Sequence, residues 1–139
     1  SRSLMRGVVR GLHYQRPPFA QGKLVRCSSG ALFDAIVDIR KGSPTYGRSA
    51  SVTLSMENGL QLWVPRGFAH GFCALEAGTQ IAYKVDAPYS PECDAGILWN
   101  DPALGIDWPI RADEALLAPK DIAHPALADA PVDFEWTAP

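Results

Sequence analysis

Short runs in which apolar and polar residues alternate recur along this chain, and glycine or proline separates them. The clearest run covers residues 33–40, where one parity holds Phe33, Ala35, Val37 and Ile39 and the other holds Asp34, Ile36, Asp38 and Arg40. Strict alternation predicts a β-strand with one face buried and the other in solvent.

Six further runs have the lengths and apolar content of strands, and turn residues stand between them. They cover residues 7–15, 23–27, 49–54, 60–64, 70–75 and 80–85. Seven strands at this spacing predict an all-β sandwich, jelly roll or barrel. With 139 residues the chain has the length of one domain, and its 47% hydrophobic content excludes disorder.

Beyond Pro91 the alternation stops, and a loop-rich tail is expected to wrap the strands. Only Asp113 to Leu117 suggests a helical turn, and the last dozen residues are expected to be poorly ordered.

Charge and composition exclude several classes of function. The formal net charge of −2 argues against a nucleic-acid-binding surface. The apolar stretches are too short to span a membrane, and the first residues contain no apolar segment of a secretory signal. Three cysteines without a CxxC spacing predict reduced thiols, so we expect a cytoplasmic protein without disulfides.

A local group of cations in the first part of the chain favours an anionic small molecule as the ligand. They are Arg6, Arg10, Arg16, Lys23 and Arg26.

His13 is the first candidate for chemistry, because a histidine with a near-neutral pKa is a natural general base. Most lone histidines are surface or core residues, and this alternative stays open. Arg10 and His13 have opposite parity, so a regular strand would separate them; a β-bulge at Gly11 would bring both inward.

The spacing Pro65-x-Gly67-x-x-His70 is that of the second cupin motif. In metal cupins this histidine is a ligand, together with a His-x-His pair and a carboxylate. His13 has no second histidine two residues away and His124 lies in the Ala/Pro-rich tail, so we expect no metal site.

Three other side chains are weaker candidates by themselves. Tyr83 lies in the middle of an expected strand, where packing is the usual role. Asp121 could orient a histidine, and Asp34 and Asp38, on the polar parity of their strand, compete for that role.

Taken together, five motifs are similar to those of the dTDP-4-dehydrorhamnose 3,5-epimerase family, in the family's order. They are RGLHYQ at 10–15, AQGKLVRC at 20–27, VDIRKGSPTYG at 37–47, QLWVPRGFAHGF at 61–72 and ILWNDP at 97–102. The resemblance implies a cupin-like jelly roll with a loop-rich C-terminal tail. It also implies a cofactor-independent isomerase that inverts C3, C5 or both in dTDP-4-dehydro-6-deoxyglucose, working as a homodimer.

The resemblance also implies roles for individual residues. His13 matches the base, Asp121 its dyad partner and Tyr83 the proton donor on the opposite face of the sugar. Lys23 matches a residue that is both catalytic and substrate-binding, near the C4 oxygen. The remaining matches are to substrate contacts: Arg10 near the same oxygen, His70 in the pocket, Tyr89 against thymine, and Asp94 and Lys120 on the nucleotide side.

The chain departs from the family at its start, because Ser1 follows the point where the family's N-terminal strand and nucleotide contacts would lie. We therefore expect a single cupin domain over residues 1–139 that lacks this segment. The alternatives are a catalytically impaired dTDP-sugar-binding protein and a metal-dependent cupin enzyme. Residues 4–9 are expected to pair across a two-fold axis in the dimer.

Overall fold

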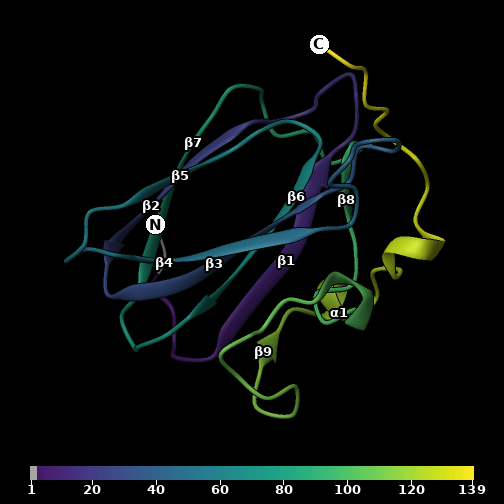
Figure 1. Ribbon diagram of the computed structural model, residues 1–139. Coiled ribbons are helices and arrows are strands. Elements are labelled where there is room, and N and C mark those ends of the chain that lie inside the picture. Colours follow the sequence, from purple (N-terminus) through teal and green to yellow (C-terminus); the bar gives the residue numbers. More distant parts are fainter. Residues whose placement is uncertain (1–2) are drawn as a thin grey trace.

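Two β-sheets form the framework of the computed structural model, which describes residues 3–139. The expectation that the chain start is no secretory signal concerns residues 1 and 2 in part, and these two lie outside the described residues. The larger sheet has the order β4-β3-β6-β1-β8, with β9 also pairing with β1, and the smaller has the order β5-β2-β7 (Figure 1). The strands are β1 (Val8–Gln15), β2 (Lys23–Ser29), β3 (Ala31–Asp38), β4 (Ser49–Ser55), β5 (Gln61–Val64), β6 (Phe68–Ala74), β7 (Gln80–Val85), β8 (Asp94–Gly96) and β9 (Leu116–Leu117).

All seven expected runs are strands, and the all-β prediction is confirmed. The two short strands β8 and β9 were not predicted, because two or three residues are too few for a periodic pattern. The helical turn predicted at residues 113–117 is wrong, since this segment ends in β9. The short helix α1 (Pro119–Ile122) follows it instead, with Pro119 in its first turn.

The two sheets pack face to face around one apolar interior. Val25 and Cys27 of β2 meet Leu32, Leu54 and Phe72 of the larger sheet there. Burial of these side chains stabilises the sandwich by roughly 25 cal/mol per Å² of apolar surface removed from water.

The outer face of the larger sheet is also buried, which differs from the sequence prediction. Val37 and Ile39 pack beneath the tail residues Trp108 and Phe134, and Phe33 contacts Trp108 with ring centroids 5.4 Å apart. The polar parity of β3 therefore faces the interior between the sheets and not solvent. Periodicity in β3 identifies a strand, but it does not reveal what covers either face.

The tail runs back along the sheet as predicted (Figure 1), and hydrogen bonds hold it as far as Trp136. Tyr14 Oη donates a hydrogen bond to Asp133 at 2.9 Å. The backbone N–H groups of Lys41 and Trp136 bond to the carbonyls of Phe134 and Lys41, both at 2.9 Å. The prediction of a poorly ordered end is wrong, because these contacts and the Phe134 ring tie the last residues to the sheet.

Residues 4–9, expected to pair across a two-fold axis, pair within the chain instead. Leu4 pairs with Thr79, and Val9 lies between Cys73 of β6 and Leu117 of β9. In the described part of the chain the outermost strands are β4, β8 and the short β9 in the larger sheet, and β5 and β7 in the smaller one.

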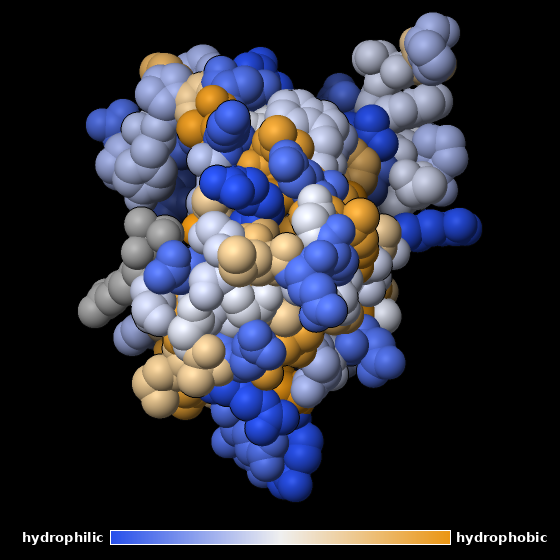
Figure 2. Space-filling view, turned by 90° about the vertical axis from the view of Figure 1, so that its left-hand side faces the viewer, coloured by the Kyte–Doolittle hydropathy of each residue, from blue (hydrophilic) through white to orange (hydrophobic). Residues whose placement is uncertain are grey.

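Two surface findings bear on the environment of the protein. No helix in residues 3–139 is long and apolar enough to cross a membrane. In the view of Figure 2, apolar residues reach the surface in small groups between charged ones.

Candidate active site

A β-bulge in β1 sets the position of the candidate base. The pairing of β1 with β6 shifts register between Arg10 and His13, as their opposite parity predicts. Gly11 has φ 126°, and a Cβ at this position would lie 2.6 Å from Gly71 Cα. Only glycine permits this approach. As a result, Arg10 and His13 line the same cavity.

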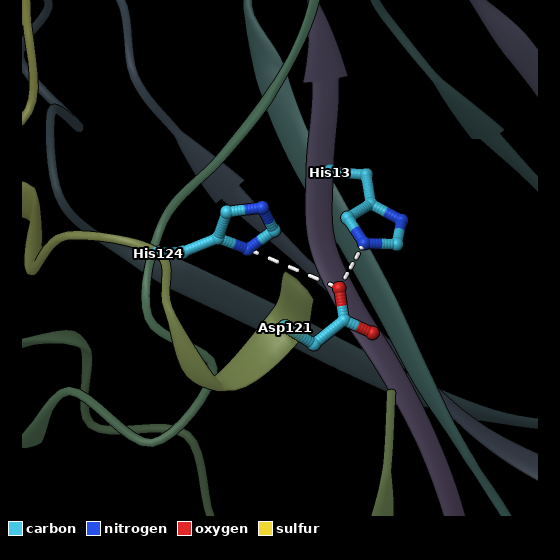
Figure 3. Close-up of side chains that lie close together, drawn as sticks. All are labelled: His13, Asp121 and His124. Carbon is cyan, nitrogen blue, oxygen red and sulfur yellow. Dashed lines mark hydrogen bonds and ion pairs between the residues drawn. The ribbon is translucent and has the colours of Figure 1, made fainter. Parts of the chain in front are cut away.

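His13 and Asp121 form a hydrogen-bonded pair, with Nε2 and Oδ1 2.5 Å apart (Figure 3). The Gly11 N–H donates to the other oxygen of Asp121 at 3.4 Å. Burial works to raise the pKa of Asp121, but the His13 hydrogen bond and charge outweigh it and lower that pKa below its usual value. The carboxylate is thus ionised at neutral pH and accepts the Nε2–H of His13, which leaves Nδ1 as the nitrogen able to take a proton.

A second histidine–carboxylate pair lies deeper in the same wall. His70 Nε2 is 2.5 Å from Asp34 Oδ1, and the pair is buried. Asp34 is thus an orienting carboxylate, but for His70 and not for His13. Asp38 orients no histidine, because it accepts hydrogen bonds from Arg40, Ser43 and Thr45.

Tyr83 lies across from these histidines on the smaller sheet. Its ring meets the ring of His70 edge to face, with centroids 6.0 Å apart. Desolvation, followed by the negative charge of Asp34, raises the pKa of the Tyr83 phenol well above its usual value. At neutral pH the hydroxyl is therefore protonated and able to donate a proton.

Two lysines supply positive charge beside these groups. Burial lowers the pKa of Lys23, while the charges of Asp94 and Asp34 oppose this shift. Lys120 donates a hydrogen bond to Asp94 at 3.3 Å. Because Lys23 and Lys120 come from opposite ends of the chain, the fold is what brings them together.

Two adjoining cavities connect the site to solvent, with volumes of about 330 and 380 Å³. Four residues line both: His13, Lys23, Tyr83 and Lys120. The first cavity also touches Asp94 and the exposed ring of Tyr89, and the second touches Arg10 and His70. The structure therefore brings all nine sequence-predicted site residues to one region, with Asp121 behind His13.

One residue of this region was missed by the sequence analysis. His124 was placed in a featureless tail, yet its ring meets that of His13 edge to face at 5.6 Å. Its Nδ1 lies 3.9 Å from Asp121 Oδ1. The one sequence feature that could have indicated this contact is the three-residue spacing between Asp121 and His124.

The arrangement defines a class of protein: a β-sandwich with a pocket lined by a histidine that is hydrogen-bonded to a carboxylate, by a protonated phenol and by two lysines. Such a site suits the removal and return of protons on a small anionic molecule.

The chain belongs to the dTDP-4-dehydrorhamnose 3,5-epimerase family, whose sequence model matches residues 1–129. A curated family member from Sinorhizobium fredii is 60% identical over 130 residues, which are 94% of this chain and 66% of that protein. One from Escherichia coli is 50% identical over 84% of this chain and 62% of its own length. The chain thus spans about two thirds of the length of these relatives.

Solved structures agree with this assignment. The epimerase from Legionella pneumophila in complex with dTDP-4-keto-L-rhamnose has a TM-score of 0.93 at 45% identity, covering 99% of this chain and 73% of that one. ChmJ, a 3'-monoepimerase from Streptomyces bikiniensis in complex with dTDP-quinovose, has a TM-score of 0.84 at 35% identity, covering 91% and 64%. The predicted family and the cupin-like jelly-roll fold are confirmed.

Proposed function

We propose that this protein is an epimerase that inverts carbons next to the 4-keto group of a dTDP-4-keto-6-deoxyhexose, without a bound cofactor. The observation that carries the proposal is the pairing of His13 with an ionised Asp121, opposite Tyr83, in the wall of one pocket. Inversion requires a proton to leave one face of a carbon and another to arrive on the opposite face, and these two residues supply the two groups.

In the first step, His13 Nδ1 takes the proton from the carbon beside the ketone. The electron pair of the C–H bond moves onto the carbonyl oxygen and gives an enolate. Lys23 and Arg10 stabilise this growing negative charge, which is the main reason that a weakly acidic carbon can be deprotonated. Asp121 stabilises the imidazolium that forms.

In the second step, the Tyr83 hydroxyl gives its proton to the opposite face of the same carbon and the ketone is restored. Solvent then takes the proton from His13 and returns one to Tyr83. The reaction is an isomerisation with no net oxidation, so its atoms and electrons balance without a co-reactant.

The nucleotide end of the substrate is proposed to lie at the outer cavity. Tyr89 is 66% exposed at its rim, and an aromatic ring there offers a surface for stacking a base. The ion pair of Lys120 with Asp94 lies beside it. The relative from L. pneumophila is bound to dTDP-4-keto-L-rhamnose, which supports a dTDP-sugar as the ligand class.

Isotope exchange tests this function. Incubation of protein and dTDP-4-keto-6-deoxyglucose in D₂O should place deuterium at C3 and C5. Deuterium at one carbon only would indicate a monoepimerase, the class to which ChmJ belongs. Binding of dTDP by calorimetry with both protons retained would contradict the epimerase and support a dTDP-sugar-binding protein instead.

We also propose a cytoplasmic homodimer. The three cysteines are free and buried, as a reducing compartment allows. The edge strand β5 and the turn before it expose Met56, Leu60 and Trp63, which a second subunit would cover. Light scattering should give twice the mass of the chain; a monomer mass that does not change with concentration would contradict the dimer.

A further inference from the structure

His124 comes from the turn that follows α1, and it packs against β8. Gly96, which pairs with His13 across β1 and β8, makes room for it. A Cβ at Gly96 would lie 2.4 to 2.7 Å from three atoms of the His124 ring, so the ring occupies the space of a missing side chain. The imidazole is therefore held in one place by the sheet beneath it.

The Nδ1 atom of His124 is buried and has no hydrogen-bond partner among the described residues. A buried polar atom without a partner is costly, and native proteins contain few of them. Figure 3 shows this nitrogen directed toward Asp121, on the side opposite His13. Asp121 Oδ1 thus lies between two imidazole nitrogens, at 2.5 Å from His13 and 3.9 Å from His124.

We propose that His13, Asp121 and His124 form a binding site for one divalent transition-metal ion, such as Zn²⁺, and that the ion inhibits the enzyme. The second half of the proposal rests on the proposed function, and the first half does not.

The spacing of the three donors suits such an ion. They lie within 4.8 Å of one another. Zinc bonds of about 2.0 to 2.1 Å in a tetrahedral arrangement put neighbouring ligand atoms roughly 3.3 Å apart. The two measured separations, 2.5 and 3.9 Å, lie on either side of that value. To admit the ion, His13 Nε2 and Asp121 Oδ1 therefore have to move apart, and Asp121 Oδ1 has to approach His124 Nδ1.

The donor set selects the kind of metal. Two imidazole nitrogens and one carboxylate oxygen suit Zn²⁺ or Co²⁺, while Mg²⁺ and Ca²⁺ require mainly oxygen ligands. The carboxylate also offsets the charge of the ion. Side chains of the two histidines are 22% and 17% exposed, whereas Asp121 and the His124 Nδ1 atom are buried, so the ion has to enter past the histidine rings.

Inhibition follows from the tautomer of His13. In the free enzyme the proton lies on Nε2, next to Asp121, and the Nδ1 lone pair is the base. A metal on Nε2 requires that nitrogen to lose its proton, and the neutral imidazole then carries its proton on Nδ1. The nitrogen that should accept the substrate proton has become a donor, so proton abstraction stops.

Calorimetric titration of the tag-free protein with Zn²⁺ at neutral pH tests the binding site. One equivalent should bind to wild type, and Mg²⁺ should not bind. His124→Ala and His124→Phe keep the other two ligands, and the second also keeps a ring over Gly96. Both should lose at least the roughly 10–100-fold in affinity that a missing second-shell partner costs. Circular dichroism shows whether each variant is folded.

Co²⁺ provides a second readout, because its visible absorption is intense when four ligands surround it tetrahedrally. The band should appear in wild type and be absent from both variants. No stoichiometric binding by wild type would overturn the site. Equal Zn²⁺ affinity in wild type and the folded variants would also overturn it, and would direct attention to the cysteine thiols.

Deuterium exchange measures the inhibition. Zn²⁺ should suppress exchange by wild type over the concentrations at which it binds, and EDTA should restore it. The exchange activity that remains in the His124 variants should be insensitive to the same Zn²⁺ concentrations. Binding without loss of exchange would overturn the inhibitory role. If wild type shows no exchange even without metal, the proposed function fails, while the calorimetric result still decides the site.

Discussion

The two histidine–carboxylate pairs of this molecule have the same hydrogen bond and different surroundings. In each, Nε2 of the histidine lies 2.5 Å from a carboxylate oxygen. The side chain of His13 is 22% exposed and lines both cavities, whereas that of His70 is 3% exposed. The two histidines therefore differ in their exposure to the cavities and not in the length of their hydrogen bonds.

The difference is consistent with different roles in the proposed proton transfer. The open pair lines the pocket where a substrate carbon would lie. The buried pair instead contacts the ring of Tyr83. We infer that the open pair is the candidate base and that the buried pair positions the ring of the candidate proton donor.

The largest expected effect is on catalysis. His13→Ala should reduce deuterium exchange at both carbons by about 10²–10⁴-fold, the contribution of one positioned base. The measurement is the rate of deuterium incorporation into the sugar by mass spectrometry. Arg111→Ala is the control, because the Arg111 side chain is exposed and, among residues 3–139, forms its ion pair with Asp113. Exchange by His13→Ala at the wild-type rate would show that the open pair is not the base.

Replacing the histidine of the buried pair by alanine should lower the free energy of unfolding. His70→Ala leaves Asp34 buried, with one oxygen already unpartnered in the described structure. Breaking a buried pair in this way costs about 3–5 kcal/mol. His13→Ala also removes the partner of a buried carboxylate, but it should cost less, because the 22% exposed position of His13 lets water replace the ring and Asp121 keeps its contact with Gly11.

Urea unfolding of the two alanine variants measures this contrast. The midpoint should fall strongly for His70→Ala and less for His13→Ala, with similar slopes for both. Equal losses of stability would mean that burial does not distinguish the pairs.

Tyr83→Phe should separate abstraction of the proton from its delivery. The variant keeps the ring against His70 and removes only the hydroxyl. Exchange through His13 should persist while formation of inverted product falls, because no group remains to protonate the opposite face. Deuterium content and product configuration, measured by NMR on the same sample, test this. A parallel fall in both signals would contradict the assigned division of roles.

Local sequence patterns predicted the strands that carry the two pairs, but they did not predict which face of β3 is buried between the sheets. The opposite parity of Arg10 and His13 showed that a regular strand would separate them, and the bulge at Gly11 named as the way to bring both inward is present. The alternation in β3 correctly indicated a strand. It placed Asp34 toward solvent, however, since periodicity cannot show that the tail covers the other face.

The contacts of His124 lie beyond such patterns altogether. His124 is more than a hundred residues from His13 in sequence, and the two meet only because β8 pairs with β1 and α1 follows the returning tail. The family resemblance predicted Asp121 as the partner of His13, but it assigned no role to His124. Long-range packing of a loop-rich segment is the physical information that the sequence analysis lacked.

The smallest expected effect concerns a third carboxylate, which lies on the same strand and parity as Asp34. Asp38 accepts hydrogen bonds from Arg40, Ser43 and Thr45, whereas Asp34 bonds to His70. Burial works to raise the pKa of Asp38, but these hydrogen bonds outweigh it and hold the pKa far below its ordinary value of 3.8. Since the folded state binds the proton more weakly than the unfolded state does, Asp38 stabilises the fold above that ordinary value.

This contribution is lost as the pH falls below 3.8 toward the lower pKa of the folded state. Asp38→Asn should therefore lower the free energy of unfolding at neutral pH and flatten its decline in acid, measured by urea unfolding at a series of pH values. Asp113→Asn, at an exposed ion pair with Arg111, should leave the acid decline unchanged. Parallel curves for wild type and Asp38→Asn would mean that Asp38 has the same pKa in both states, and that hydrogen bonds from Arg40 and the two hydroxyls do not favour its charged form.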